Sequence, residues 1–208
     1  EYGWENNREE LKVNSLKIFD GYLKNGFTPA GFFKEFVNLN RGFEEPVHSI
    51  RRQSEGIYAM LHFLAYEKEQ GRKHPEWEQR VKQMFEMFLK LQNADGSFPR
   101  KFRDDFTIVD KSGGSTPSAT LPLVMGYKYF KDKRYLASAR KTAEYLEKEL
   151  ISKADYFSST LDANCEDKEA SLYTATATYY LSLITKGEEH KHYADLTKKA
   201  AYFALSWY

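Results

Sequence analysis

Long stretches of the sequence follow a helical period, and they alternate between two patterns of apolar and polar positions. Three segments, which begin near residues 54, 116 and 168, have bodies that are almost free of charge. The segments that follow them are amphipathic, as in PEWEQRVKQMFEMFLKLQ at 75–92. A helix that is apolar all round is buried on most sides, whereas an amphipathic helix keeps one face in water. The pattern therefore predicts an inner and an outer layer of helices.

Capping and turn residues set the bounds of the predicted helices. The expected ranges are 6–26, 54–70, 75–92, 116–130, 132–151, 168–186 and 188–208. The first range opens with Asn and closes at Gly26, and Pro75 and Pro117 suit the first turn of a helix. No long window alternates at period two, so we expect no substantial strand.

The amphipathic segments align with one another at a fixed spacing. Trp77, Tyr135 and Tyr193 take equivalent places at intervals of 58 residues. This spacing predicts an array of antiparallel helical hairpins. The turn within each hairpin is short, whereas the connections between hairpins, at 27–48, 93–115 and 152–167, are long. In an up-down array, all three long connections lie at one end, beside the starts of the uncharged helices, and long connections are often functional.

Two segments resemble the α/α-toroid proteins, in particular the six-hairpin glycosidases. YFKDKRYLASARKTAEYLEKEL at 129–150 is similar to the helical hairpin of such toroids. FLKLQNADGSFP at 88–99 is similar to the Gln, Asp-Gly, aromatic signature that ends outer helices in several toroid families, terpenoid cyclases included. The resemblance implies an all-α fold, an array of antiparallel helical hairpins that forms part of an (α/α)-toroid with inner and outer helices. It also implies a carbohydrate site at the starts of the inner helices.

We expect residues 1–208 to form a single toroid-like domain that is incomplete. A six-hairpin toroid has twelve helices, whereas seven are predicted here. The end hairpins should therefore expose apolar flanks. The expected partners for these flanks are the remaining hairpins of a longer chain or a self-association partner.

Composition narrows the classes of partner. The apolar fraction of 41% and the aromatic fraction of 16% are typical of a folded chain. Because 31 basic residues face 30 acidic ones without a basic stripe, we expect no nucleic-acid partner. No apolar run approaches the length of about 20 residues that spans a bilayer, so we expect no membrane insertion. The single cysteine, Cys165, excludes an internal disulfide and a multi-cysteine zinc site, and we expect no metal or other cofactor.

A dense acidic cluster, Asp162, Glu166, Asp167 and Glu169, precedes the last uncharged segment. One interpretation is helix capping, since Asp162 or Asp167 suits the N-cap and each acid near a helix start contributes about 0.3–1 kcal/mol. The other is catalysis, because glycoside cleavage needs two carboxylates about 5–10 Å apart and repulsion among acids raises the pKa of at least one. We choose Asp162 and Glu166, and then Glu55, as catalytic candidates. A calcium site on Asp162, Asn164 and Glu166 is a third alternative, although the segment lacks the glycine and distal glutamate of an EF-hand.

Candidate substrate-binding residues lie on or beside the same long connections. Aromatic faces pack against sugar rings, and arginines pair with a uronate carboxylate. The candidates are His48, Arg51, Arg52, Asp95, Phe98, Arg100 and Tyr156. The QNADGSF segment at 92–98 also has a structural interpretation, in which Gln92 binds loop backbone, Asp95-Gly96 forms a turn and Phe98 packs back. Cys165 is expected to be a buried small hydrophobe rather than a nucleophile.

The favoured function is that of a glycoside hydrolase-like enzyme that acts on a poly- or oligosaccharide by carboxylate acid/base chemistry. A toroid polysaccharide lyase would instead use a base such as His48 or Tyr156 near Arg51. A non-catalytic helical module for glycan binding or domain support is a further alternative. A terpenoid cyclase is disfavoured because the sequence has no Asp-x-Asp-Asp run. We expect a carbohydrate ligand and a periplasmic or secreted location, although the segment EYGWENNREE at 1–10 shows no signal peptide.

Overall fold

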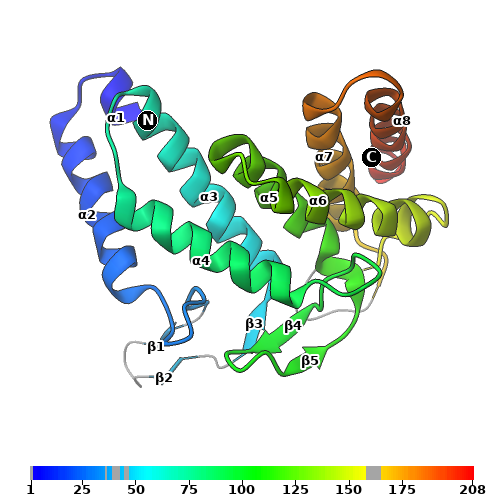
Figure 1. Ribbon diagram of the computed structural model, residues 1–208, viewed down its shortest axis with the longest axis horizontal. Helices are drawn as coiled ribbons and strands as arrows, with labels where there is room; N and C mark the ends of the chain where they lie inside the picture. Colours follow the sequence, from blue (N-terminus) through cyan, green and yellow to red (C-terminus); the bar gives the residue numbers. More distant parts are fainter. Residues whose placement is uncertain (1, 36, 39–42, 45–46, 158–164) are drawn as a thin grey trace.

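The computed structural model describes residues 2–35, 37–38, 43–44, 47–157 and 165–208. Its long helices are α2 (Glu9–Asn25), α3 (Ile50–Glu69), α4 (Pro75–Leu91), α5 (Thr116–Phe130), α6 (Lys133–Tyr145), α7 (Lys168–Ile184) and α8 (Gly187–Leu205), shown in Figure 1. A short helix α1 (Tyr2–Glu5) precedes them, a 3-10 turn (Gly113–Ser115) leads into α5, and α6 continues into a π-helical segment (Leu146–Ile151). All seven predicted helices are confirmed, with small shifts at their ends.

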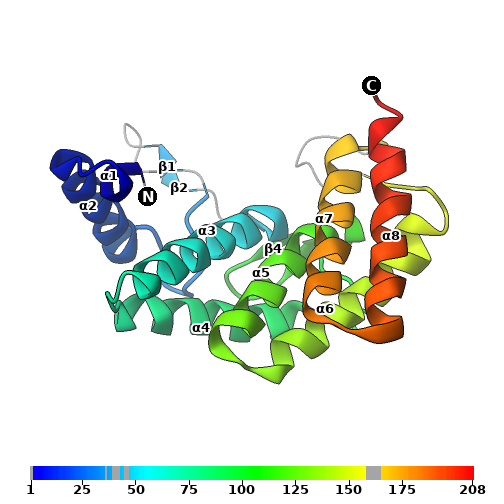
Figure 2. The same cartoon turned by 90° about the horizontal axis from the view of Figure 1, so that it is seen from above.

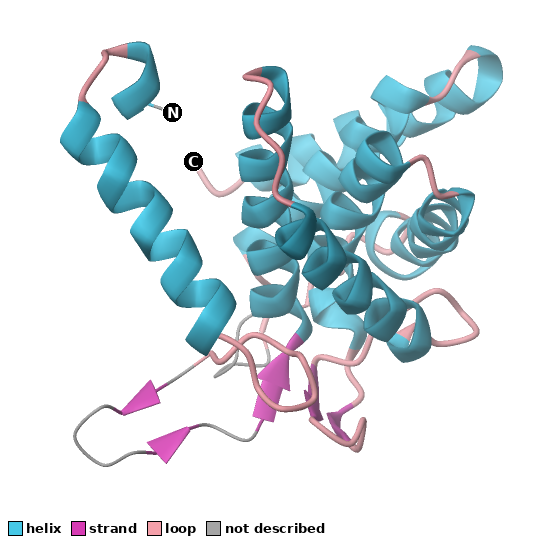
Figure 3. Cartoon of the chain, turned by 60° about the vertical axis from the view of Figure 1, so that its left-hand side comes forward, coloured by secondary structure: helices cyan, strands magenta, loops and turns pink. Residues whose placement is uncertain are grey.

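Short strands lie in the long connections, and none of the described strands exceeds three residues, which agrees with the expectation of no substantial strand. The strands are β1 (Val37–Asn38), β2 (Phe43–Glu44), β3 (Val47–Ser49), β4 (Lys101–Arg103) and β5 (Ile108–Asp110). β3, β4 and β5 form an antiparallel sheet in which His48 faces Phe102. A strand of two or three residues is too short to show an alternating pattern in the sequence. Figure 3 shows these strands together beneath one end of the helices.

The helices form the two predicted layers. α5 packs between α3 and α7, and each of these inner helices packs against the outer helix that follows it, α4, α6 or α8. Figure 2 shows the hairpins following one another in an open arc from α2 to α8. The long connections before α3 and α5 meet in the three-stranded sheet at the starts of these inner helices. None of the described helices is long and apolar enough to cross a membrane.

The helix in the middle of the arc, α5, is more completely buried than the helices toward its ends. In α5, ten of 15 residues are buried, and a Cβ at Gly126 would lie 2.4 Å from the ring of Phe85. α7 carries no charge after Lys168 and Glu169 in its first turn, yet it leaves Leu172, Tyr179 and Leu183 between 45% and 57% exposed. Exposed apolar side chains also occur on α2, at the other end of the arc. The predicted apolar flanks are therefore present on the end elements.

The repeated aromatic residues anchor the outer helices to the inner layer. Trp77, Tyr135 and Tyr193 are all at least 93% buried, as their equivalent places in the sequence predict. The ring of Tyr135 also stacks on Phe85 of the preceding outer helix, with 4.3 Å between ring centroids. This contact links α6 to α4.

Side-chain caps fix the starts of two inner helices. Ser49 Oγ accepts a hydrogen bond from the backbone N–H of Arg52 at 3.3 Å, so α3 begins at Ile50, four residues before the predicted start at Ser54. Asp167 caps α7 by accepting from the backbone N–H of Glu169 at 2.8 Å. The capping interpretation of Asp167 is therefore confirmed.

The QNADGSF segment ties the end of α4 to α6. Gln92 Nε2 donates to the carbonyl of Ser138 at 3.0 Å and to the carbonyl of Gly96 at 3.2 Å. Ser138 Oγ donates back to Gln92 Oε1 at 2.8 Å. At Gly96 the backbone φ is +91°, and a Cβ there would lie 2.1 Å from the carbonyl oxygen of Lys141. Only glycine fits this approach, which confirms the structural interpretation of the segment.

A buried polar cluster holds the first two long connections together. His48 is 1% exposed, and its Nε2 lies 2.7 Å from Asp104 Oδ1, in the turn between β4 and β5. On the other side, His48 Nδ1 lies 4.0 Å from Oε1 of the buried Glu35. Glu35 Oε1 also accepts from the backbone N–H of Ser49 at 2.7 Å and from Gln53 Nε2 at 2.8 Å. Burial raises the pKa of Glu35, although these hydrogen bonds and the nearby His48 oppose the shift.

Gly96→Ala is expected to destabilise the fold more than Gly71→Ala does. Gly71 also has a positive φ, +76°, but no atom lies within 4 Å of the place that a Cβ would occupy there. Gly71→Ala should therefore lower the free energy of unfolding by the backbone cost alone, about 1 kcal/mol. Gly96→Ala adds the clash with Lys141 and should cost at least about 2 kcal/mol. Urea denaturation measures both losses, and equal losses would show that the Gly96 contact is absent.

The pKa of Glu35 predicts how stability depends on pH. The folded state binds the proton of Glu35 more tightly than the unfolded state does, in which the pKa is near 4.5, so the contribution of Glu35 to the free energy of unfolding falls as pH rises through the window above 4.5. Glu35→Gln keeps an oxygen for both hydrogen bonds and has no charge to bury. The free energy of unfolding of the variant, relative to that of wild type, should therefore increase as pH rises. Urea denaturation at a series of pH values measures both free energies. The matched control Glu10→Gln, on the exposed face of α2, should follow wild type; parallel curves for Glu35→Gln and wild type would rule out the effect.

Candidate functional site

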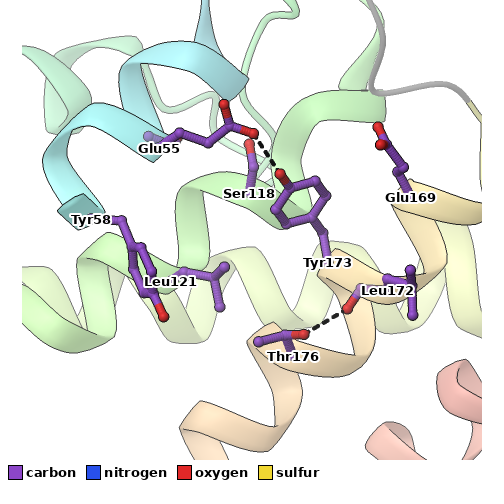
Figure 4. Close-up of a pocket in the computed structure, with 9 residues that line it drawn as sticks. Glu55, Tyr58, Ser118, Leu121, Glu169, Leu172, Tyr173 and Thr176 are labelled. Carbon is purple, nitrogen blue, oxygen red and sulfur yellow. Dashed lines mark hydrogen bonds between the residues drawn. The ribbon is translucent and has the colours of Figure 1, made fainter. Parts of the chain in front are cut away.

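A cavity of about 390 Å³ opens between the first halves of the three inner helices, α3, α5 and α7. We call it the inner cavity, and Figure 4 shows most of its lining. The lining residues are Ser54, Glu55, Tyr58, Ser118, Leu121, Glu169, Leu172, Tyr173 and Thr176. It lies toward the end where the long connections join the inner helices. This is the place in the fold that the sequence predicts for a site.

Arg51 joins two carboxylates of this cavity. Arg51 and Glu55 lie one turn apart on α3, and Arg51 Nε donates to Glu55 Oε1 at 3.0 Å. Arg51 Nη1 donates to Glu169 Oε2, on α7, at 2.6 Å. The guanidinium also lies over the ring of Tyr173, with Cζ 5.4 Å from the ring centroid. One arginine therefore links the starts of two inner helices that are separated by more than a hundred residues in the sequence.

The surroundings fix the protonation states of Arg51 and Tyr173. Burial opposes the charge of Arg51, but the hydrogen bonds to Glu55 and Glu169 outweigh burial and raise the pKa of Arg51 above its usual range. Tyr173 Oη donates to Glu55 Oε1, as Figure 4 shows. Burial, together with this hydrogen bond, raises the pKa of Tyr173 to about 12. At neutral pH the site therefore holds a charged guanidinium and a neutral phenol.

The remaining walls of the inner cavity combine hydroxyl groups with apolar surface. Tyr58 Oη lies 2.8 Å from Tyr180 Oη, and burial raises the pKa of Tyr58 to about 12. Ser54 is 1% exposed, and its Oγ has no hydrogen-bond partner among the described residues. Leu121 and Leu172 supply apolar surface. Neutral hydroxyls, aromatic faces and a few charged groups are the features that suit a sugar ring.

The catalytic candidates from the sequence lie in different places. Glu55 lines the inner cavity. Glu166 is exposed and does not line it, and its Oε2 accepts from the backbone N–H of Tyr156 at 3.2 Å. Burial and the neighbouring Asp155 raise the pKa of Glu166, against the hydrogen bond from Tyr156. Asp162 lies outside the described residues.

Of the nine lining residues, the candidates from the sequence include only Glu55, so they omit Glu169 and Tyr173. Glu169 was grouped with the acids of the α7 start, and only the fold shows that it meets Arg51. No sequence signal points to a pair 118 residues apart.

The calcium alternative depends on Asp162 and Asn164, which lie outside the described residues. The described part of the chain contains no group of three His, Cys, Asp or Glu residues placed to hold a metal ion.

Of the substrate-binding candidates, Arg51 reaches the carboxylates of the inner cavity, and three others belong to the packing of the second long connection. Asp95 Oδ1 accepts from the backbone N–H of Ser97 at 3.0 Å. Phe98 is fully buried. Arg100 is 3% exposed, and its Nη1 lies 3.4 Å from Asp110 Oδ2.

The other three candidates lie away from the inner cavity lining. His48 belongs to the buried cluster with Glu35. Arg52 borders a second cavity, of about 370 Å³, between α2, α3 and α4, where its Nη1 lies 3.8 Å from Glu35 Oε2. Tyr156 is buried against Phe203, with 4.4 Å between ring centroids.

The prediction that Cys165 is a buried hydrophobe is wrong. Its side chain is exposed. Cys165 lies in the connection just before the Asp167 cap, outside the packed layers of helices. The apolar character of a cysteine does not by itself decide burial in such a connection.

Comparisons with known proteins support the architecture. No protein-family model matches the chain. Among solved structures, it is similar to the unsaturated glucuronyl hydrolase of Bacillus sp. GL1, an enzyme responsible for the degradation of glycosaminoglycan, with a TM-score of 0.71 and 12% sequence identity. The match covers 94% of this chain and 56% of that enzyme, so the chain spans little more than half of the enzyme's length. At this identity the likeness shows the fold: the chain has the paired inner and outer helices of an α/α-toroid, as its resemblance to the six-hairpin glycosidases implies.

Proposed function

We propose that the chain is a carbohydrate-active domain of the glycoside hydrolase type, acting on a poly- or oligosaccharide through a pair of carboxylates. The observation that carries the proposal is the convergence of Glu55 and Glu169, from two inner helices, on one cavity and one arginine. Because both carboxylates bind the same guanidinium, we expect their separation to fall within the range of about 5–10 Å that glycoside hydrolysis uses. The glycosaminoglycan-degrading enzyme of similar fold supports a carbohydrate as the ligand.

The contacts of the two carboxylates suggest their roles. Glu55 Oε1 receives hydrogen bonds from both Arg51 and Tyr173, so it is held as an acceptor and suits the base. The two side chains are about equally exposed, 45% for Glu55 and 47% for Glu169, and we assign the role of the acid to Glu169, which accepts a hydrogen bond from Arg51 through Oε2. In the proposed reaction, the ion pair between Glu169 and Arg51 opens, Glu169 takes up a proton from solvent, and it then donates this proton to the glycosidic oxygen as the bond from that oxygen to the anomeric carbon breaks. Glu55 takes a proton from the water that adds to this carbon.

The lyase alternative is less well supported by the same site. A lyase base must remove a proton from a sugar carbon, and the tyrosine beside Arg51 is Tyr173. Its pKa is raised to about 12, by burial and by the hydrogen bond to Glu55, which opposes deprotonation. His48 and Tyr156, the bases that the sequence suggested, do not line the inner cavity.

A non-catalytic glycan-binding module has one observation in its favour. Arg51 occupies both carboxylates, so one ion pair must open before either group can transfer a proton. Binding without turnover would identify this alternative. A periplasmic or secreted location, and coverage of the apolar flanks by further hairpins or a second copy, stay predictions.

The experiment is a digest of a glycan library with the wild-type chain and with single carboxylate variants. Glu55→Gln and Glu169→Gln should each lower the rate of cleavage by about 100-fold or more, because each removes one of the two groups that transfer protons. Glu166→Gln is the matched control. It is an acid on the same segment as Glu169, and it lies outside the lining of the inner cavity.

Three outcomes distinguish the possibilities. Loss of cleavage in Glu55→Gln and Glu169→Gln, with activity kept in Glu166→Gln, supports the proposed pair. Loss of cleavage in Glu166→Gln alone would indicate that the catalytic residues lie in the acidic cluster before α7. Binding of a glycan by the wild-type chain without any cleavage would identify the binding module.

A further inference from the structure

The charges around the inner cavity are unequal. Two of the described residues that line it are acidic, Glu55 and Glu169, and none is basic. Arg51 is near but does not line the cavity, and two of its nitrogens donate to these carboxylates. While both ion pairs are closed, as in the structure, the trio carries one positive and two negative charges, so an arriving ligand meets a wall with a net negative charge. A cavity lined by one sign of charge favours ligands of the opposite sign.

The other two arginines that were candidates for binding a uronate lie beside acidic residues outside the inner cavity. Arg100 is buried beside Asp110 in the second long connection. Arg52 lies beside Glu35, at the second cavity. Neither residue lines the inner cavity, so neither offsets the charge of its two carboxylates.

We infer that the sugar residue bound in the inner cavity carries no carboxylate, and that an amino sugar is preferred over a neutral one. This inference rests on the proposed function, which places a sugar between Glu55 and Glu169. A uronate would bring a third carboxylate to this pair, and like charges brought together oppose binding. A protonated amine would instead donate charge-assisted hydrogen bonds to the carboxylates that are already there.

Ser54 adds an independent indication that a polar ligand group binds here. Its side chain is almost fully buried, it lines the inner cavity, and its Oγ has no partner among the described residues. A buried hydroxyl without a partner has a free energy cost that a ligand hydroxyl or amine removes by bonding to it. Ser54 directly precedes Glu55 in α3, so the unpartnered hydroxyl and the carboxylate belong to the same wall.

The test compares three ligands that differ at one position each: methyl β-glucoside, methyl β-glucosaminide and methyl β-glucuronide. The second replaces one hydroxyl of the first by an amine, and the third replaces one hydroxymethyl group by a carboxylate. Dissociation constants come from NMR titration of the wild-type chain near neutral pH. The glucosaminide should bind tightest and the glucuronide weakest, with steps of about fivefold, the effect of one pair of unit charges at 4 Å in water.

Two variants test whether the order of the three affinities is set by the charges of the inner cavity. Glu169→Gln removes one negative charge and should bring the dissociation constants of the glucosaminide and the glucuronide closer together. Glu10→Gln changes the net charge by the same amount, on the exposed face of α2, and should leave the order of the ligands as in wild type.

Each outcome decides the inference. The inference is supported if wild type binds the three ligands in the expected order and if Glu169→Gln shows a smaller difference between the dissociation constants of the glucosaminide and the glucuronide. A glucuronide that binds as well as the glucoside or better overturns it, while leaving the proposed carbohydrate function in place. If none of the three sugars binds, the proposed function fails, and the inference fails with it. The ranking in wild type holds as a test even if Glu169→Gln does not fold.

Discussion

The burial of α5 is the constraint on which the arrangement depends. This helix has no charged residue before Lys128, and most of its surface is buried. It can satisfy that requirement only where other helices cover it, and the structure places α3 and α7 on its flanks and α6 behind it. Because the turn within each hairpin is short, α3, α5 and α7 all start at the same end. The meeting of Arg51, Glu55 and Glu169 follows from the packing around α5, although these residues lie on its two neighbours.

The fold and the chemistry of the site give different kinds of information. The likeness to a glucuronyl hydrolase extends over nearly the whole chain, yet 12% identity leaves the lining of the cavity free to differ. Here the lining combines two acids, neutral hydroxyls and apolar surface, and the nearest arginine already binds both acids. The proposed class of ligand therefore rests on the cavity together with the fold, and the proposed preference among sugars rests on the charges of this chain.

Much of the fold could be predicted from the sequence, because burial leaves a periodic pattern. The 58-residue spacing of Trp77, Tyr135 and Tyr193 marks the buried face of each outer helix. The site was harder to predict, since residues of different helices meet only through tertiary packing. The start of α3 was placed at Ser54, so the turn that presents Arg51 and Glu55 together was missed; the cap from Ser49 and its pairing in β3 set the start at Ile50. The same reasoning placed Glu55 and Arg51 among the candidates, but it gave no means of joining them to Glu169.

The most direct test of the convergence is a double-mutant cycle between Arg51 and Glu169. The free energy of unfolding is measured by urea denaturation for wild type, Arg51→Met, Glu169→Gln and the double variant. If the two side chains meet as described, the double variant should lose less stability than the two single variants together, with a coupling of at least about 0.5 kcal/mol. Losses that add to within about 0.3 kcal/mol would show that Arg51 and Glu169 do not interact, and would contradict the site.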